Sequence, residues 1–236
     1  MEREYDVEIA ILGGGPAGYL AAVRAAQLGA RVAIVEQEEF GGVCLNRGCI
    51  PTKALLRTVE LATLARRGQE FGVVGLPAVV DWLSAQNRKG RVVKSLRLGV
   101  EHLLQKDAIT VIKGQGRIAT LGKMIVETAD GAVTVRCRKM LVATGSRTIR
   151  PSISGLESQA VLTSEEILEL AEAPERLTVI GGGAIGLEFA QMFNSLGTKV
   201  AVIEMADQLL PQEDAELAGE VLKSLKRQGI KVHLAS

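Results

Sequence analysis

Two stretches of the chain repeat the same order of apolar, glycine and polar positions. IAILGGGPAGYLAAVRAAQLGARVAIVE (Ile9–Glu36) aligns without a gap with LTVIGGGAIGLEFAQMFNSLGTKVAVIE (Leu177–Glu204), at an offset of 168 residues and with ten of the 28 positions identical. Each copy reads as a buried strand, a glycine-rich turn, a helix of about three turns and a second strand. Gly29 and Gly197 are expected to end the two helices, because glycine readily takes the left-handed conformation that follows a helix.

The residues between the copies change from helical to alternating period. Apolar positions at helical spacing predict a helix over 51–68 and a second helix over 79–105. Residues 109–142 predict instead an antiparallel insertion followed by a buried strand. The segments that read as its short strands are ITVIKG, GRIATL, KMIVET, AVTVR and KMLVAT. Residues 150–175 are richer in Pro and Ser and carry a short helix that Ser164 is expected to cap.

These elements predict an α/β fold with two Rossmann-like nucleotide-binding units. Residues 1–150 form the expected first domain, which includes the antiparallel insertion, and residues 151–175 form the linker. The second unit, 176–236, contains after its repeat only a helix over 213–228 and a strand over 230–234. A doubly wound nucleotide domain has more strands than that. We therefore expect the chain to be the front part of a larger protein, with its second nucleotide domain incomplete.

Composition and charge narrow the classes of function. Of the 236 residues, 47% are hydrophobic and 23% are charged, which is typical of a packed core and excludes wholesale disorder. The net charge of +1 gives no field that would draw the chain to nucleic acid or to an anionic membrane. No apolar run reaches the roughly 18 residues of a membrane span. The charged N-terminus has no secretory layout, so we expect a cytoplasmic protein.

Both copies carry the glycine spacing of a dinucleotide-binding turn. The two motifs are Gly13-x-Gly15-x-x-Gly18 and Gly181-x-Gly183-x-x-Gly186. In each motif the first glycine makes the tight turn, the second lets the backbone approach a pyrophosphate, and the third lets the helix pack on the strand. The helix N-terminus then offers N–H groups to the phosphates. The alternative is a pair of tight strand–helix turns that bind no ligand.

An acid follows each motif at the same spacing. Glu36 lies 18 residues after Gly18, and Glu204 lies 18 residues after Gly186. At the end of the second strand a carboxylate can accept hydrogen bonds from ribose hydroxyls. Glu204 would repel a 2′-phosphate, and Met205 follows it rather than an arginine. NAD is therefore favoured over NADP at the second turn.

A pair of cysteines, Cys44 and Cys49, stands in the segment FGGVCLNRGCIPTK. Residues five apart in a helix are separated by about 7.5 Å along its axis, whereas the Cα atoms of a disulfide lie within roughly 7 Å. A bridge between them therefore requires a distorted helix, and Pro51 suits the first turn of the helix that follows. Cys49 would lie near a helix N-terminus and Lys53, a setting that favours a reactive thiolate.

Three other interpretations of the cysteine pair are weaker. A zinc site needs four ligands, and the remaining candidates, Cys137, His102 and His233, stand in unrelated elements. A plant-type iron–sulfur loop needs a third cysteine where this chain has Thr52. Two inert buried thiols are the third alternative. Redox activity is favoured, no metal site is expected, and Cys137 is expected to pack in the core.

Four motifs together resemble the pyridine nucleotide–disulfide oxidoreductases, among them most closely the dihydrolipoyl dehydrogenases. The motifs are GGGPAG, GGVCLNRGCIPTK, LVATGS at Leu141–Ser146 and GGGAIGLE at Gly181–Glu188. The resemblance covers essentially the whole chain. It implies a flavin-dependent oxidoreductase that passes electrons between a dihydrolipoyl group and NAD through a Cys44–Cys49 disulfide and FAD. The alternatives are a related disulfide or mercuric reductase, and a flavin- or nucleotide-binding fragment without turnover.

The resemblance also implies roles for residues of this sequence. Cys49 would face the flavin, Cys44 would exchange with the substrate, and Lys53 would lie near the flavin, paired with Glu188. Gly116 would approach the adenine. The residues expected to bind FAD are Gly13, Gly15, Pro16, Ala17, Gly18, Glu36, Gly42, Val43, Cys44, Lys53, Gly116, Thr144, Gly145 and Ser146. Those expected to bind NAD are Gly181, Gly183, Ile185, Gly186, Glu188 and Glu204.

The sequence departs from the family pattern in two places. Val43 stands where many members have threonine, which removes a hydroxyl beside the flavin phosphates. The family's catalytic His–Glu pair belongs to a C-terminal interface domain and is donated by the partner subunit. Neither His102 nor His233 has that sequence context, so we expect this domain to be absent and the chain alone to be a poor catalyst. The intact enzyme is expected to be a homodimer that serves a lipoyl-bearing protein of a 2-oxo acid dehydrogenase or glycine cleavage complex.

Overall fold

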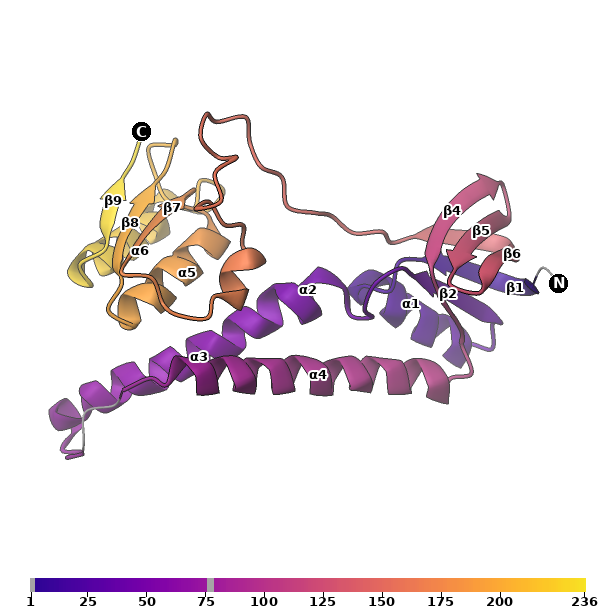
Figure 1. The fold of residues 1–236 in the computed structure, drawn as a ribbon, viewed down its shortest axis with the longest axis horizontal. Helices are drawn as coiled ribbons and strands as arrows, with labels where there is room; N and C mark the ends of the chain where they lie inside the picture. The colour runs from indigo at the N-terminus through magenta and orange to yellow at the C-terminus, as the bar shows by residue number, and fades with distance from the viewer. Residues whose placement is uncertain (1–2, 76–78) are drawn as a thin grey trace. The chain divides into compact units, whose positions relative to one another are not determined.

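The computed structural model describes residues 3–75 and 79–236, which divide into two units (Figure 1). The first unit contains Met1–Pro51 and Arg91–Ile149, and the second contains Thr52–Gly90 and Arg150–Ser236. Each unit is therefore assembled from two separate stretches of sequence. Two of the three boundaries fall inside long helices, α3 (Cys49–Arg66) and α4 (Trp82–Lys106), and the third falls between Ile149 and Arg150. The nucleotide-binding roles expected for residues 1–150 and 176–236 stay predictions.

Six strands form the sheet of the first unit. They are β1 (Arg3–Leu12), β2 (Val32–Glu36), β3 (Thr110–Lys113), β4 (Gln115–Thr120), β5 (Lys123–Thr128) and β6 (Gly131–Val142). Their order is β3-β2-β1-β6-β5-β4. The strands β3, β2, β1 and β6 run parallel to one another, whereas β5 is antiparallel to both β6 and β4. The predicted α/β class with an antiparallel insertion is confirmed.

The strand β6 corrects one detail of that prediction. AVTVR and KMLVAT are predicted as separate strands, but AVTVR and the first four residues of KMLVAT belong to this single strand of 12 residues. Its length pairs in parallel with β1, and its first half also pairs with β5. The polar run in its middle does not interrupt it, because the backbone of β6 pairs with β1 from Val133 to Val142. Arg136 and Arg138 also form exposed ion pairs with Glu4 and Glu8 of β1.

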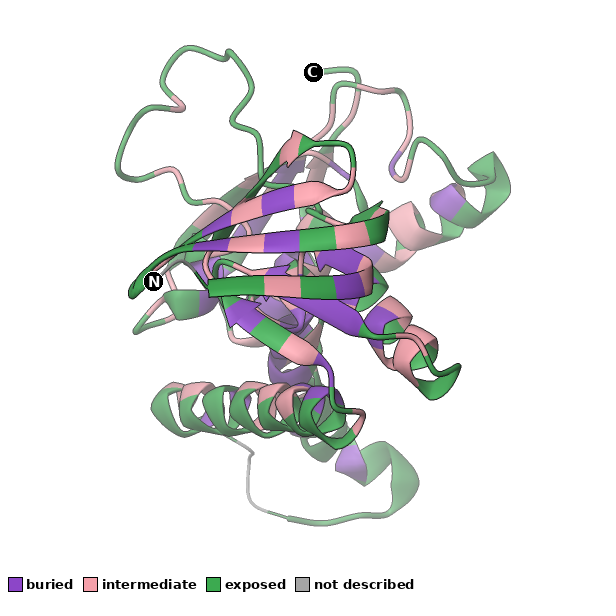
Figure 2. Ribbon diagram, turned by 90° about the vertical axis from the view of Figure 1, so that its right-hand side faces the viewer, coloured by how far each residue is buried: buried purple, intermediate pink, exposed green. Residues whose placement is uncertain are grey.

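The two faces of this sheet are covered differently. One face packs on the helix α1 (Pro16–Gln27) and on the C-terminal part of α4, through a cluster that includes Ile11, Ala22, Ile34, Phe40 and Leu104. The other face forms a cluster with the antiparallel insertion, which includes Ala10, Val35, Met124, Val126 and Val135. Figure 2 shows the buried positions along these strands. The strand β2 is buried on both faces, which explains its unbroken apolar sequence.

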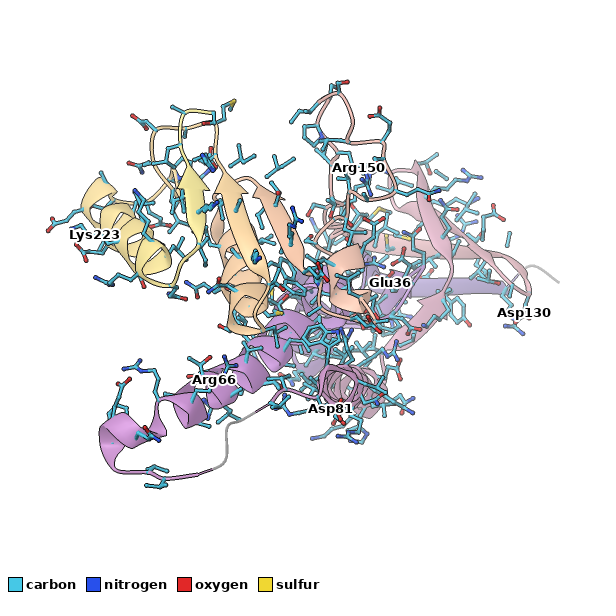
Figure 3. The ribbon with its side chains drawn as sticks, turned by 60° about the vertical axis from the view of Figure 1, so that its left-hand side comes forward. Glu36, Arg66, Asp81, Asp130, Arg150 and Lys223 are labelled. Atoms are coloured by element: carbon cyan, nitrogen blue, oxygen red, sulfur yellow. The ribbon has the colours of Figure 1, made fainter. Side chains whose placement is uncertain are left out.

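The second unit contains a three-stranded parallel sheet with the order β7-β8-β9. Its elements are η2 (Glu166–Glu169), β7 (Arg176–Ile180), α5 (Ala184–Ser195), β8 (Lys199–Ile203), α6 (Ala215–Arg227) and β9 (Lys231–His233), with η1 (Gly68–Phe71) after α3. Its core packs α5 and the sheet against Leu55 and Val59 of α3. The ring of Trp82 lies 5.9 Å from the ring of Phe193. Arg66 donates to the Ser195 carbonyl at 2.9 Å (Figure 3).

Helix ends follow the expected chemistry at most positions. Gly29 and Gly197, with φ of 89° and 97°, follow the ends of α1 and α5 as predicted. The helix α4 begins three residues later than expected, after Asp81. The Asp81 carboxylate accepts hydrogen bonds from the backbone N–H of Ser84 (3.1 Å) and its hydroxyl (2.6 Å). These bonds hold the pKa of Asp81 below its usual range and cap the helix.

The short helix before β7 is a 3₁₀ helix, and the prediction that Ser164 caps it is wrong. Thr163 and Glu166 form the cap reciprocally. The Thr163 N–H donates to the Glu166 carboxylate at 2.6 Å, and the Glu166 N–H donates to the Thr163 hydroxyl at 3.4 Å. The carboxylate of Glu166 also binds the guanidinium of Arg150, which donates in turn to the carbonyls of Leu156 and Val161. Three residues, not one, therefore hold the segment that precedes the second sheet.

Candidate functional site

The first glycine turn is closed so tightly that larger side chains do not fit. Gly13 has φ of 109°, and its N–H donates to the carbonyl of Val35 at 2.8 Å. A Cβ atom on Gly13 would lie 2.2 Å from the carbonyl oxygen of Ala143. A Cβ atom on Gly18 would lie 1.8 Å from the carbonyl oxygen of Gly13. The glycine spacing therefore has the steric basis that the sequence predicts.

The Glu36 carboxylate is fixed next to this turn by two backbone hydrogen bonds. One oxygen accepts from the N–H of Gly14 at 2.6 Å, and the other accepts from the N–H of Glu38 at 2.8 Å. Each carboxylate oxygen has two lone pairs, so one lone pair on each remains for a ligand hydroxyl. The arrangement can bind a vicinal pair of hydroxyl groups.

A cavity of about 720 Å³ in the first unit runs along this turn. Its volume is within the range of ligand sites in proteins. Ten of the residues expected to bind FAD contribute to its lining: Gly15, Pro16, Ala17, Glu36, Gly42, Val43, Cys44, Thr144, Gly145 and Ser146. Gly13 and Gly18 do not line the cavity, but their lack of side chains allows the tight turn beside it. Most of the predicted FAD residues are thus brought together.

Gly116 and Lys53 are not among the residues that line this cavity. Gly116 lies in β4, and a Cβ atom there would come within 2.5 Å of the Leu12 side chain and 3.1 Å of Val35. The missing side chain of Gly116 therefore makes room for the core. Its predicted approach to an adenine stays a prediction.

Several lining residues were not expected from the sequence. They are Gln37, Glu38, Glu39, Asn46, Arg47, Ala143 and Arg147. The first three follow Glu36 directly, and Asn46 and Arg47 lie between the two cysteines. Glu38 and Arg47 form an ion pair between their side chains. The acidic segment EQEEF is the sequence feature that could have indicated these residues, but the sequence does not show that this segment faces the cavity.

The chemistry of this lining fits a dinucleotide. The helix α1 has Gly15 as its N-cap, which provides no side-chain cap, so its first N–H groups can bind phosphate oxygens. Gly42, with φ of 64°, approaches the turn so closely that its Cβ atom would lie 2.8 Å from the Cα atom of Gly15. A Glu36 carboxylate, a helix N-terminus and the Cys44 thiol therefore lie along one cavity. The chemistry of these residues fits FAD, and the roles expected for the individual residues stay predictions.

The two cysteines lie on either side of a helix break. The helix α2 (Gly42–Arg47) carries Cys44, and α3 begins at Cys49. Gly48 separates them with φ of −137° and ψ of −111°, outside the helical region. This is the distortion that a bridge between the cysteines requires. Cys44 is half-buried in the cavity lining, Cys49 is exposed, and the disulfide itself stays a prediction.

Lys53 and Glu188 form an ion pair within the second unit. The Lys53 ammonium donates to the Glu188 carboxylate at 2.5 Å, which is the pairing that the resemblance implies. The Lys53 side chain is 57% exposed, so water screens this pair and its contribution to stability is small. The position of the pair near a flavin ring stays a prediction.

The second glycine turn repeats the hydrogen bonds of the first. The N–H of Gly181, which has φ of 102°, donates to the Ile203 carbonyl at 2.8 Å. The Glu204 carboxylate accepts from the N–H groups of Gly182 (2.6 Å) and Ala206 (2.8 Å). These two bonds, chiefly that from Ala206, hold the pKa of Glu204 below its usual range. The acid is therefore ionised and oriented, and the turn fits the ribose end of NAD.

The other residues expected to bind NAD surround this turn. Gly183 and Ile185 belong to the beginning of α5, and Ile185 is 62% exposed. A Cβ atom on Gly186 would lie 2.4 Å from the Gly181 carbonyl oxygen, as in the first copy. A larger cavity of about 780 Å³ lies at the amino ends of β7, β8 and β9 and contains none of these residues. Nucleotides bind at the carboxyl ends of such strands, so we favour the glycine turn.

Two kinds of feature are absent from the described residues, 3–75 and 79–236. No group of three or more His, Cys, Asp and Glu side chains in this part of the chain could hold a metal ion. No helix in the same part is both long enough and apolar enough to cross a membrane. Cys137 lies half-buried in β6, where burial raises the pKa of its thiol.

Comparisons with known proteins agree with this geometry. The family model of the pyridine nucleotide-disulphide oxidoreductases matches residues 7–236. A dihydrolipoyl dehydrogenase of Bacillus subtilis is 44% identical over 98% of this chain and 50% of its own length. A dihydrolipoyl dehydrogenase of Acholeplasma laidlawii is 42% identical over 98% of this chain and 69% of its own length. The HOCl-induced flavoprotein disulfide reductase RclA of Escherichia coli, solved as a Cu(II) complex, matches with a TM-score of 0.85 and 34% identity, over 100% of this chain and 50% of that one.

The chain belongs to the pyridine nucleotide-disulphide oxidoreductases, as the motifs predict. It spans about half the length of the Bacillus subtilis and Escherichia coli proteins that it matches. The cofactors of this family are FAD and NAD, in agreement with the predicted pair. The fold, with one cavity fit for FAD and a second turn fit for NAD, is consistent with both.

Proposed function

We propose that the chain forms the dinucleotide-binding and disulfide-bearing part of an oxidoreductase similar to dihydrolipoyl dehydrogenase. The observation that carries this proposal is the cavity of the first unit, whose lining joins the Glu36 carboxylate, the amino end of α1 and Cys44. A ribose-binding acid, a phosphate-binding helix end and a thiol along one cavity favour a dinucleotide with a redox-active ring. The names of the most similar relatives support the same class of reaction.

In this proposal each glycine turn holds one dinucleotide. Glu36 accepts from the adenosine ribose of FAD, and the N–H groups at the beginning of α1 bind its phosphates. Glu204 accepts from the ribose of NAD. Lys53, oriented by Glu188, supplies a fixed positive charge. FAD held by these residues would supply the redox chemistry that links the reduced cysteine pair to NAD.

The two cysteines carry out the exchange with the substrate. A thiolate of a dihydrolipoyl group attacks the sulfur of Cys44 in the disulfide, so that the Cys44–Cys49 bond breaks and Cys49 leaves as a thiolate. The second thiolate of the substrate then attacks the substrate sulfur of this mixed disulfide. The substrate closes its own disulfide, and Cys44 leaves as a thiolate. The substrate has lost two electrons, and the cysteine pair has gained them.

The partners follow from the same proposal. The substrate is the lipoyl-bearing protein of a 2-oxo acid dehydrogenase or glycine cleavage complex, and the intact enzyme is a homodimer in the cytoplasm. The support is the similarity to proteins named dihydrolipoyl dehydrogenase.

A visible spectrum of the purified 236-residue chain, before and after an equimolar amount of dithiothreitol, tests the proposal. We expect a flavin spectrum that gains a long-wavelength shoulder, because a thiolate next to an oxidised flavin forms a charge-transfer pair. A chain that holds no flavin as purified and takes up none when FAD is added would contradict the proposal.

Three serine variants assign the thiols. Cys49→Ser is expected to abolish the shoulder, whereas Cys44→Ser is expected to retain a thiolate near the flavin without the need for a reductant. Cys137→Ser is the matched control and should behave as the original chain. The exposure of Cys49 and the position of Cys44 in the cavity lining make this comparison informative. If Cys44→Ser alone loses the shoulder, the two roles are exchanged.

A second candidate is a reductase that acts on another oxidised substrate. The observation that favours it is the match to RclA, a flavoprotein disulfide reductase induced by HOCl and solved with Cu(II). Turnover assays with dihydrolipoamide, with small disulfides and with Cu(II) as electron acceptor separate the candidates. Relative rates are compared, because the chain alone is expected to be a poor catalyst. The first candidate predicts that NAD⁺ reduction by dihydrolipoamide is the faster reaction, and the second predicts that NADH oxidation by a disulfide or Cu(II) is faster.

A further inference from the structure

The helix that carries Cys44 is too short to be stable by itself. The helix α2 contains six residues, which is too short to be stable without tertiary contacts. Gly41 and Gly42, which open it, have φ of 102° and 64°, and no side chain caps it. Its orientation must therefore be set by contacts that its other residues make.

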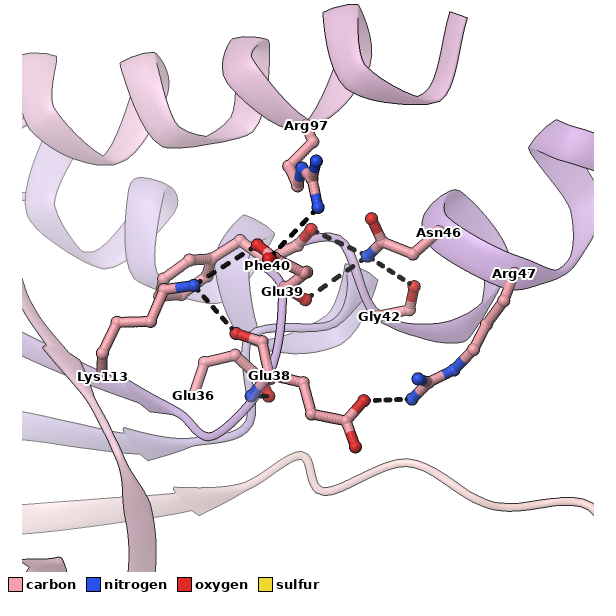
Figure 4. A network of polar contacts seen from close by, with 9 residues as sticks. All are labelled: Glu36, Glu38, Glu39, Phe40, Gly42, Asn46, Arg47, Arg97 and Lys113. Atoms are coloured by element: carbon pink, nitrogen blue, oxygen red, sulfur yellow. Dashed lines mark hydrogen bonds and ion pairs between the residues drawn. The ribbon is translucent and has the colours of Figure 1, made fainter. Parts of the chain in front are cut away.

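Asn46 makes three such contacts (Figure 4). Its side-chain nitrogen lies 3.0 Å from the Gly42 carbonyl oxygen, 3.0 Å from that of Phe40 and 3.4 Å from that of Glu39. Three carbonyl oxygens around one amide group fix which end of the amide faces them, because only the NH₂ end donates. The amide oxygen is buried and has no hydrogen-bond partner among the described residues. The contribution of Asn46 therefore comes from its donors.

The turn that Asn46 holds is joined to the glycine turn of the cavity. Phe40 is almost fully buried, and a Cβ atom on Gly14 would come within 2.5 Å of its ring. The Gly41 N–H donates to the Gly14 carbonyl at 2.9 Å, and the Gly14 N–H donates to the Glu36 carboxylate at 2.6 Å. A continuous set of contacts therefore runs from the ribose-binding acid, through the glycine turn, to the helix of Cys44.

The same loop is rich in carboxylates, and cations from three elements neutralise them. Arg47 of α2 pairs with Glu38, and Arg97 of α4 lies 3.3 Å from the Glu39 carboxylate. Lys113 of β3 lies 3.4 Å from the same carboxylate and donates to the Glu38 carbonyl at 3.0 Å. Figure 4 shows these cations around the loop. An additional negative charge at position 46 would face carbonyl oxygens in a loop that is already acidic.

We propose that Asn46 is a positioning residue that fixes Cys44 relative to the cofactor cavity. Its amide ties the carbonyl oxygens of residues 39, 40 and 42 to α2, so that Cys44 and the glycine turn keep one geometry. The proposal rests on the proposed function, because it assigns the purpose of this geometry to a dinucleotide and a reactive thiol.

The test replaces the donor by an acceptor of the same shape. Asn46→Asp loses the NH₂ group and turns a carboxylate toward three carbonyl oxygens. We expect the dissociation constant for FAD to rise by about tenfold or more, from the lost hydrogen bonds alone. Asn194→Asp is the matched control, because the Asn194 amide donates to only one carbonyl, that of Gln228, at 3.1 Å in the second unit. Its FAD affinity should stay within about twofold of the original chain.

A second readout does not depend on the flavin. The chain is first reduced with dithiothreitol and freed of the reductant, and alkylation of each cysteine by iodoacetamide is then followed by mass spectrometry. We expect Cys44 to react about fivefold faster or more in Asn46→Asp, because a loosened α2 exposes it, while Cys137 changes by less than about twofold. Equal acceleration at Cys44 and Cys137 would mean that Asn46 serves only general stability, and the proposal would be wrong. If Asn46→Asp does not fold, Asn46→Ala, which adds no charge, gives the same two measurements.

The outcomes separate the two proposals. If the original chain takes up no FAD, the proposed function fails, and the alkylation of Cys44 still tests the role of Asn46. If the original chain binds FAD and both variants at position 46 match it in affinity and in alkylation of Cys44, only the role of Asn46 is overturned.

Discussion

The two copies of the strand–turn–helix repeat agree at the turn and differ in what surrounds it. In both, the carboxylate of the acid accepts a hydrogen bond at 2.6 Å from the glycine that follows the first motif glycine, Gly14 or Gly182. It accepts another at 2.8 Å from the N–H group two residues after the acid itself. In the first copy, however, a Cβ atom on Gly13 would strike Ala143, which follows β6. At the equivalent Gly181 it would meet nothing within 4 Å. β7 also leaves Ile180 56% exposed.

This difference separates two properties that a nucleotide motif is often assumed to carry together. The orientation of the acid is local, because about thirty consecutive residues are enough to produce it twice. The enclosure of the ligand is not local, because in the first unit it comes from residues 42–47 and 143–147. The motif therefore predicts how the acid is oriented, and distant segments decide how far the cavity beside it is enclosed.

The largest effect should come from adding a methyl group to the first glycine of each motif. Gly13→Ala is expected to lower the free energy of unfolding by about 3 kcal/mol or more, because a positive φ and a backbone clash combine. Gly181→Ala should cost only about 1–2 kcal/mol, because only the positive φ acts. Urea unfolding followed by circular dichroism measures both. Equal losses would show that the surroundings of the two turns do not differ in the way described.

The next largest effect should separate the two acids by ligand. Glu36→Gln is expected to weaken FAD binding about tenfold and to leave NAD binding unchanged, because a charge-assisted hydrogen bond to the ribose is lost. Glu204→Gln should do the reverse. Isothermal titration with each dinucleotide measures this. If either variant weakens both ligands equally, the assignment of one dinucleotide to each turn is wrong.

A smaller effect should be confined to the second unit. The Asp214 carboxylate caps α6 by accepting from the N–H groups of Glu216 (2.9 Å) and Leu217 (3.4 Å). Asp214→Ala is expected to cost about 1 kcal/mol of stability. Fluorescence of Trp82, the single tryptophan, reports on this unit during urea unfolding. Asp214→Asn retains an acceptor and is the control; a loss as large as that of the alanine variant would argue against the cap.

The smallest effect should be the pH dependence that comes from Glu204. Its pKa is lowered in the folded chain by the N–H groups of Ala206 and Gly182. A lowered pKa adds stability that is complete above the ordinary glutamate value of about 4.3 and is lost as the pH falls through the folded value. Thermal unfolding between neutral and acidic pH should therefore show a shallower acid loss for Glu204→Gln than for the original chain. An unchanged profile would contradict the prediction that Glu204 contributes to the loss of stability in acid.

The elements that could be predicted from the sequence are those with local causes. The apolar period, the glycine turn and the following Gly29 or Gly197 lie within one repeat, so both copies were recognised correctly. The continuity of β6 was missed because it depends on backbone pairing with β1, whose residues lie 130 positions earlier in the chain. The cap of η2 was placed one residue too late because threonine and serine are adjacent and both can cap.

The candidate site divides in the same way. Glu36, the glycines and Cys44 were identified because each belongs to a contiguous motif. Asn46 and Glu38 were missed as lining residues because no sequence pattern reveals that the segment after Glu36 and the helix α2 face the same cavity. Gly116 shows the opposite limit. Its lack of a side chain is used by Leu12 and Val35, and a sequence does not indicate which neighbour requires the space.

The assembly of each unit from two stretches has a consequence for synthesis on the ribosome. Leu12 pairs with Val142, so the backbone groups of β1 on this edge stay unpaired while 130 further residues are synthesised. Leu55 and Val59 leave the ribosome well before Phe193, with which they share a core. Apolar surface and an open strand edge are thus exposed together during translation, which is the condition that favours aggregation. The nascent chain should therefore depend on chaperones until β6 and α5 have emerged.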